Sequence, residues 1–135
     1  MSTPTQTDVE ESILLSTKKY MGMDPDYDAF DPDVKMGINT ALFALAQMGV
    51  GPVDGITVLD ESTTWSDLLG MGPLRNMGAV KMYIYITTRK IVDPPGASNH
   101  LAAFDDVLTE YEWRIKARVE EVEHDKRVAE SQSDL

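Results

Sequence analysis

The sequence has no cysteine and only two histidines among its 135 residues. The lack of cysteine excludes disulfide frameworks, thiolate metal sites and cysteine nucleophiles. His100 and His124 fall on one expected helix, too many turns apart to share a metal ion or a proton. No glycine-rich phosphate loop is present, because Gly49-Val50-Gly51 is followed by Pro52 and not by a helix start. We therefore expect a protein that is not an enzyme, with no catalytic residues, no metal and no cofactor.

Long apolar runs and basic residues are also scarce. No apolar run approaches the ~18 residues of a membrane span, and residues 1–7 lack the basic-then-apolar layout of a signal peptide. There are 12 Lys and Arg against 23 Asp and Glu, which gives a formal net charge of -11. Because phosphate contacts need Lys and Arg, sequence-independent binding to nucleic acid is not expected. The chain length suits a single domain with a modest core.

The first third of the chain predicts two amphipathic helices. Asp8 is expected to cap the first and Gly22 to end it. Its inward positions are Val9, Ile13, Leu14 and Tyr20. The second helix is expected to have Asp31 as its N-cap, Pro32 as its first residue and Gly49 after its last. Its apolar stripe is Val34, Ile38, Ala41, Leu42, Leu45 and Met48.

An aspartate-rich segment joins these helices. The spacing of Asp24, Asp26 and Asp28 is similar to that of an EF-hand calcium loop. Ala29 stands where that loop needs glycine, and Lys35 stands where it needs a bidentate glutamate. We expect no metal site here.

Short elements are predicted in the middle of the chain. Ile56 to Val58 could form a very short strand, whose partner would have to come from another subunit. Thr64-Trp65-Ser66-Asp67 has the pattern of a capping box and predicts a short helix with Trp65 as a core residue beneath it.

The segment from Leu74 to Val92 allows two interpretations. Met82 to Thr88 is rich in β-branched and aromatic residues and alternates well enough for a strand. The longer pattern, with apolar residues at three- and four-residue steps from Met77 to Ile91, favours a helix. Such a helix would be apolar nearly all round and would belong in an interior or between subunits. It must stop at Asp93, because Pro94 removes a backbone donor.

The last helix is expected to be capped by Ser98, to run from Asn99 to about Val128, and to fray over residues 131–135. One narrow apolar stripe follows it: Leu101, Phe104, Leu108, Tyr111, Ile115, Val119 and Val122. Trp113 points almost directly away from that stripe. A large aromatic residue there indicates a helix that buries two faces, one against its own subunit and one against a neighbour. An intrachain contact between Trp113 and the first helix is the alternative.

These patterns predict a mainly α fold, a small bundle of about four main helices with a long C-terminal helix. We expect a lead-in over residues 1–7, a helical domain over 8–119 and a charged C-terminal extension over 120–135.

Several short motifs, in order, resemble the head–tail connector (adaptor) proteins of long-tailed bacteriophages. They are Ile13-Leu14-Leu15 with Lys18-Lys19-Tyr20-Met21-Gly22, Gln47-Met48-Gly49-Val50-Gly51-Pro52, Thr64-Trp65-Ser66-Asp67, Tyr83-Ile84-Tyr85, Asp93-Pro94-Pro95 and Glu112-Trp113-Arg114. The resemblance spans about Ile13 to Glu120, and none of the motifs is specific alone.

The resemblance implies a helical structural protein that assembles as a ring, typically of about twelve subunits, below the capsid portal. Such a ring extends the DNA channel, and its partners are further copies of itself, the portal protein and the next head-completion or tail protein. It would be found in the virion and, during assembly, in the host cytoplasm. The resemblance also favours helix for Leu74 to Val92. DNA would pass through without sequence-specific binding, which suits an acidic chain.

Five residues are the candidate subunit or portal contacts: Trp113, Arg114, Arg118, Tyr85 and Glu120. Trp113 is the expected buried anchor, because aromatic anchors tend to carry interface energy. Arg114 and Arg118 would pair with an acidic neighbour.

Two other functions share some of these features. A small acidic helical interaction or regulatory protein, acting as a monomer or dimer, would have the same helices and charge. A helix-turn-helix DNA binder would need a basic recognition helix, and the second helix has only Lys35 as a basic residue.

Overall fold

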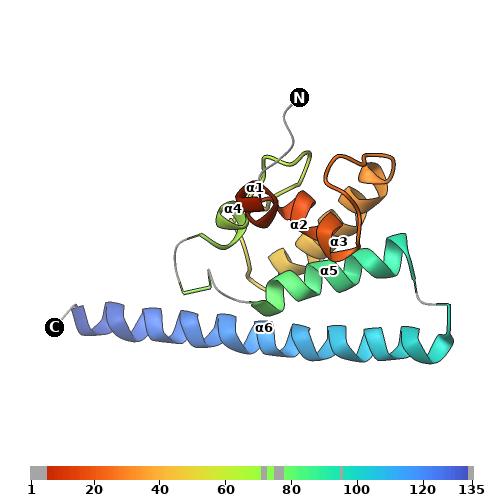
Figure 1. Cartoon of the computed structure of the whole chain (residues 1–135). Coiled ribbons are helices and arrows are strands. Elements are labelled where there is room, and N and C mark those ends of the chain that lie inside the picture. Colours follow the sequence, from red (N-terminus) through yellow and green to blue (C-terminus); the bar gives the residue numbers. More distant parts are fainter. Residues whose placement is uncertain (1–5, 71–72, 75–77, 95, 134–135) are drawn as a thin grey trace.

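The computed structural model describes residues 6–70, 73–74, 78–94 and 96–133. In this part of the chain the helices are α1 Gln6–Glu11, α2 Ile13–Tyr20, α3 Asp31–Gln47, α4 Trp65–Leu69, α5 Gly78–Val92 and α6 Ser98–Ser133. The long α6 runs along one side of the molecule, and α5 lies between α6 and the pair α2 and α3 (Figure 1). The β pairing among the described residues is a single bridge between Ser12 and Thr64. The predicted mainly helical fold with a long C-terminal helix is confirmed.

Helices α3 and α5 form the centre of the core. The predicted stripe of α3 is confirmed, since Val34, Ile38, Ala41, Leu42 and Leu45 are buried and Met48 is half-buried. The two helices approach closely at Gly37, where an added Cβ would lie 2.8 Å from the Thr88 Cα atom. Only a residue without a side chain fits such a crossing.

The segment that allowed both strand and helix is helical from Gly78 to Val92. Apolar residues occur nearly all round this helix because it packs against three others, α2, α3 and α6. Five of its residues are buried: Val80, Tyr83, Ile84, Ile86 and Thr88. Ile91, the last residue of the predicted apolar pattern, is exposed. Met77, the expected first residue of the stripe, lies outside the described residues.

The prediction of one N-terminal helix capped by Asp8 is wrong, because Asp8 lies inside α1. The chain forms α1 and α2, and Ser12 between them has extended dihedral angles and caps α2 by accepting from the Leu15 N–H at 3.2 Å. The break arises because this stretch is bonded to the loop before α4, with the Ile13 N–H donating to the Thr63 carbonyl at 3.1 Å. Tyr20 is exposed and not inward as expected. Gly22 ends α2 with a φ of 79°, as predicted.

Three predicted helix boundaries also need correction. Asp31 is the first residue of α3 and not its cap; the capping position is Phe30, which makes no side-chain capping bond. Ser98 is likewise the first residue of α6. The helix then continues past Val128 to Ser133, so residues 131–133 of the expected frayed end are helical; residues 134–135 lie outside the described residues. Residues after Glu120 are mostly good helix formers, which explains the longer helix.

The middle of the chain is held by side chains and not by a strand. Around Val58, the Asn39 amide replaces a partner strand: it accepts from the Val58 N–H at 2.8 Å and donates to the Val58 carbonyl at 3.0 Å. The capping box of Thr64 and Asp67 is present as predicted. Trp65 is a core residue, 5% exposed, and its indole N–H donates to the Ser16 Oγ atom at 3.0 Å.

Candidate interaction surfaces

The inner side of α6 is its predicted apolar stripe. Ile115 is fully buried, and the other members are half-buried: Leu101, Phe104, Leu108, Tyr111, Val119 and Val122. This side packs on α5. No helix in the described ranges has the length and hydropathy to cross a bilayer. The same residues contain no group of three or more His, Asp or Glu placed to hold a metal.

Contacts between α5 and α6 fix which side of α6 faces outward. The Tyr83 hydroxyl donates to the Glu112 Oε1 atom at 2.9 Å, and burial together with this bond raises the pKa of Tyr83. Lys90 forms an ion pair with Asp105 near the other end of the crossing. These links prevent α6 from rotating about its axis, so its outer side is well defined.

Trp113 lies on that outer side and is 71% exposed. The single chain therefore leaves the indole in solvent, and the alternative of an intrachain contact with the first helix is not what the structure shows. Asp106 and Glu120 lie seven residues before and after Trp113 and share its side of the helix, and both are exposed. We call Asp106, Trp113 and Glu120 the outer face of α6.

Arg114 and Arg118 have partners within their own helix. Arg114 pairs with Glu110 at 2.7 Å, and Arg118 pairs with Glu121 at 3.0 Å. Exposed pairs of this kind contribute roughly 0.3–0.5 kcal/mol, little enough that a neighbouring carboxylate could replace the partner. Their predicted role in a contact between subunits stays a prediction.

Tyr85, the remaining candidate, lies on α5 and apart from the outer face of α6. Its ring stacks on Tyr20 with centroids 4.8 Å apart, and it meets the Trp65 ring edge-on at 6.0 Å. Burial raises the pKa of Tyr85. Tyr20 and Tyr85 line an open groove of about 510 Å³ between α2 and α5, together with Glu10, Ser16, Lys19 and Lys81. We call this the tyrosine groove; the predicted contact residues thus divide between two surfaces.

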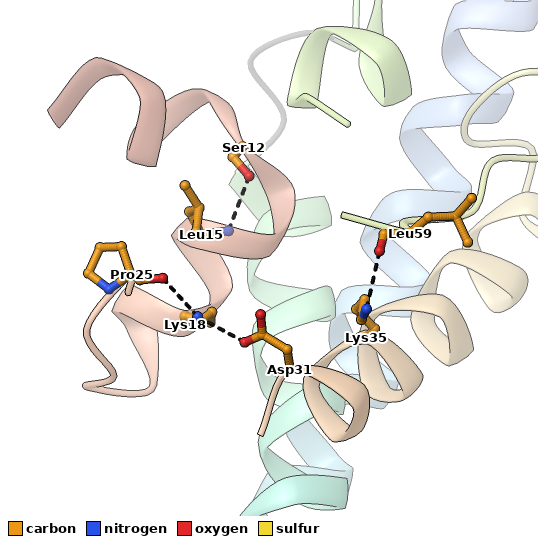
Figure 2. A network of polar contacts seen from close by, with 7 residues as sticks. All are labelled: Ser12, Leu15, Lys18, Pro25, Asp31, Lys35 and Leu59. Carbon is orange, nitrogen blue, oxygen red and sulfur yellow. Dashed lines mark hydrogen bonds and ion pairs between the residues drawn. The ribbon is translucent and has the colours of Figure 1, made fainter. Parts of the chain in front are cut away.

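A buried lysine was missed by sequence reasoning. Lys18 is 0% exposed, and its Nζ atom lies 3.0 Å from the Pro25 carbonyl oxygen and 2.8 Å from the Asp31 Oδ1 atom (Figure 2). The contact ties α2 to the turn that follows it and to the start of α3. A signal was available, because Lys18 follows buried Leu14 by four residues and so shares its side of the helix.

Comparison with models of protein families matches residues 13–122 to the family described as Phage connector protein. The match begins with α2 and ends within α6, so it includes both surfaces apart from Glu10. No curated protein and no solved structure matches the chain.

Proposed function

This chain belongs to the phage connector protein family, which implies a structural role in head–tail connection, and we propose that it forms a ring below the capsid portal. The ring would extend the DNA channel and offer a docking site to the next head-completion or tail protein. Its partners would be further copies of itself and the portal protein, with no catalytic step.

Exposed Trp113 is the observation that supports assembly most directly. A tryptophan buries roughly 150–250 Å² when it is covered, and such residues are enriched among the anchors of interfaces. Trp113 is 71% exposed, and the opposite side of its helix already packs on α5. The indole is therefore available for contact with another subunit. Arg114, Arg118 and Glu120 lie on the same helix and are the candidate charged contacts.

The end of α6 supports a second contact. The helix extends beyond the other elements at its C-terminal end (Figure 1). Residues 123–133 are all exposed and mostly polar or charged, so they have no role in the core of the chain. We propose that residues 120–135 form an extension that reaches the portal, and that residues 8–119 form the ring domain.

The acidity of the chain suits a channel wall. With a formal net charge of -11, the ring would repel the phosphates of DNA and let the genome pass without binding to it.

Native mass over a range of concentrations tests the proposal, first for the chain alone and then with the portal present. A closed species of about twelve subunits is expected under one of these conditions. A stable dimer under both would favour the alternative of a small acidic regulatory protein. A chain that stays monomeric and ignores the portal would contradict a connector.

A further inference from the structure

The tyrosine groove contains unusual cations for so acidic a chain. Lys19 and Lys81 both line it, and none of the ion pairs among the described residues involves either lysine. Lys81 lies instead over the Trp65 ring, with its Nζ atom 5.2 Å from the ring centroid. The lining has one carboxylate, Glu10, so it carries a net positive charge beside the stacked rings of Tyr20 and Tyr85.

The outer face of α6 has the complementary chemistry. It presents a 71% exposed indole between two carboxylates, Asp106 and Glu120, neither of which has an ion pair within the described ranges. In an α-helix each carboxylate lies about 10.5 Å along the axis from Trp113. An aromatic residue flanked by negative charges would therefore meet tyrosines flanked by positive charges.

One chain cannot join its own two surfaces. Helix α6 packs its apolar stripe on α5, so the outer face points away from α5. The groove is lined by residues of α2 and α5, and α5 lies between α2 and α6 (Figure 1). The two patches are different, and contact between different patches gives a head-to-tail arrangement. Such an arrangement closes into a ring or continues as a filament, and does not stop at a two-fold dimer.

We propose that the tyrosine groove receives the outer face of α6 from a second copy of this chain. In that contact Trp113 packs against the rings of Tyr20 and Tyr85, while Lys19 and Lys81 pair with Asp106 and Glu120. Aromatic contacts of this kind add about 0.5–1.5 kcal/mol beyond the area they bury, and the charges fix the register. The inference rests on the proposed assembly and names the two surfaces that carry it.

Charge reversal tests the pairing under the condition in which the wild-type chain assembles. Lys19→Glu with Lys81→Glu, and separately Asp106→Lys with Glu120→Lys, should each raise the concentration needed for assembly at least about tenfold. The quadruple variant should restore assembly, since the charges are exchanged across the contact. Lys35→Glu, on α3 and outside both surfaces and the proposed extension, is the control for added negative charge and should assemble as the wild type does. Circular dichroism verifies that each variant is folded.

Cross-linking tests the geometry, and a chain without cysteine suits it. Lys19→Cys and Ala117→Cys are made as separate chains and treated with a short bis-maleimide. Covalent dimers should form when the two are mixed and not when either is treated alone. Dimers of Ala117→Cys alone would indicate an α6–α6 contact and overturn the inference.

The outcomes separate this inference from the proposed function. If the wild type assembles but neither the charge reversals nor the cysteine pair has an effect, the groove is not the receiving surface, and the connector role stands. If the wild type assembles neither alone nor with the portal, both proposals are wrong.

Discussion

At the scale of single residues, Lys18 shows how much one buried side chain can contribute. Its charge is removed from water and compensated by the Pro25 carbonyl and the Asp31 carboxylate. A buried charge on an apolar face cannot be recognised from composition, and its acidic partner lies on another helix. Sequence reasoning assigned Asp31 to capping because aspartate before proline is common at helix starts.

We predict that Lys18→Ala lowers the free energy of unfolding by about 3 kcal/mol, because it leaves a cavity and strands the Asp31 carboxylate. Lys19→Ala, the exposed neighbour on the same helix, should change it by less than about 0.5 kcal/mol. Urea denaturation of both variants measures the difference. Equal effects would mean that the ion pair of Lys18 contributes nothing.

Gly37 provides a second prediction, since its added Cβ would lie 2.8 Å from backbone of the facing helix. Gly37→Ala should destabilise the chain by about 1–3 kcal/mol, because α3 and α5 must move apart, despite the better helix propensity of alanine. At Gly78 an added Cβ meets nothing within 4 Å, so Gly78→Ala should be neutral or slightly stabilising. Thermal unfolding of the pair distinguishes crowding from propensity; a gain in stability from Gly37→Ala would contradict the close approach.

At the scale of elements, the sequence predicted what depends on periodicity and failed where distant segments decide. The stripes of α3 and α6 were predicted residue by residue, and the all-round apolar pattern placed α5 in the interior. The break at Ser12 was missed because it depends on the Thr63–Thr64 segment, which lies far away in sequence. The Asn39 contact with Val58 was missed for the same reason. The tyrosine groove likewise combines α2 with α5, and Tyr85 was the only residue of its lining predicted as a contact residue.

The contact between α5 and α6 makes a prediction about pH. Tyr83 has a pKa raised first by burial and then by its bond to Glu112, above the ~10 of an unfolded tyrosine. The folded chain favours the neutral form of Tyr83, so the contribution of Tyr83 to folding stability is fully present below about pH 10. It falls as the pH rises further, by about 1.4 kcal/mol per pH unit, because the unfolded chain then binds fewer protons.

Tyr83→Phe should therefore cost about 1 kcal/mol at pH 8, through the lost hydrogen bond, and this cost should shrink and then reverse above about pH 10. Urea denaturation of the wild type and of Tyr83→Phe at several pH values between about 8 and 11 measures this cost. Glu112→Gln is the control: it removes the charge but not the burial, so its stability should still fall at alkaline pH. If the free energies of unfolding of the wild type and of Tyr83→Phe depend on pH in the same way, Tyr83 ionises as freely in the folded chain as in the unfolded one.

At the scale of the whole molecule, the two tryptophans serve different purposes: Trp65 stabilises the fold, and Trp113 is the proposed contact for assembly. Trp65 is 5% exposed and belongs to the core, whereas Trp113 is 71% exposed and is not buried by any part of the chain that the structure describes. Trp113→Ala should therefore change the free energy of unfolding by less than about 0.5 kcal/mol. It should weaken each contact between subunits by about 2 kcal/mol or more, which prevents assembly at concentrations where the wild type assembles.

Trp65→Ala should show the opposite pattern, with a loss of about 3–5 kcal/mol in folding stability. Urea denaturation combined with native mass separates the two effects, since the first measures the single chain and the second the assembly. A Trp113→Ala chain that unfolds would assign the indole to the core, against its exposure. A folded chain that still assembles at wild-type concentrations would remove Trp113 from the interface, and with it the main support for a contact through the outer face of α6.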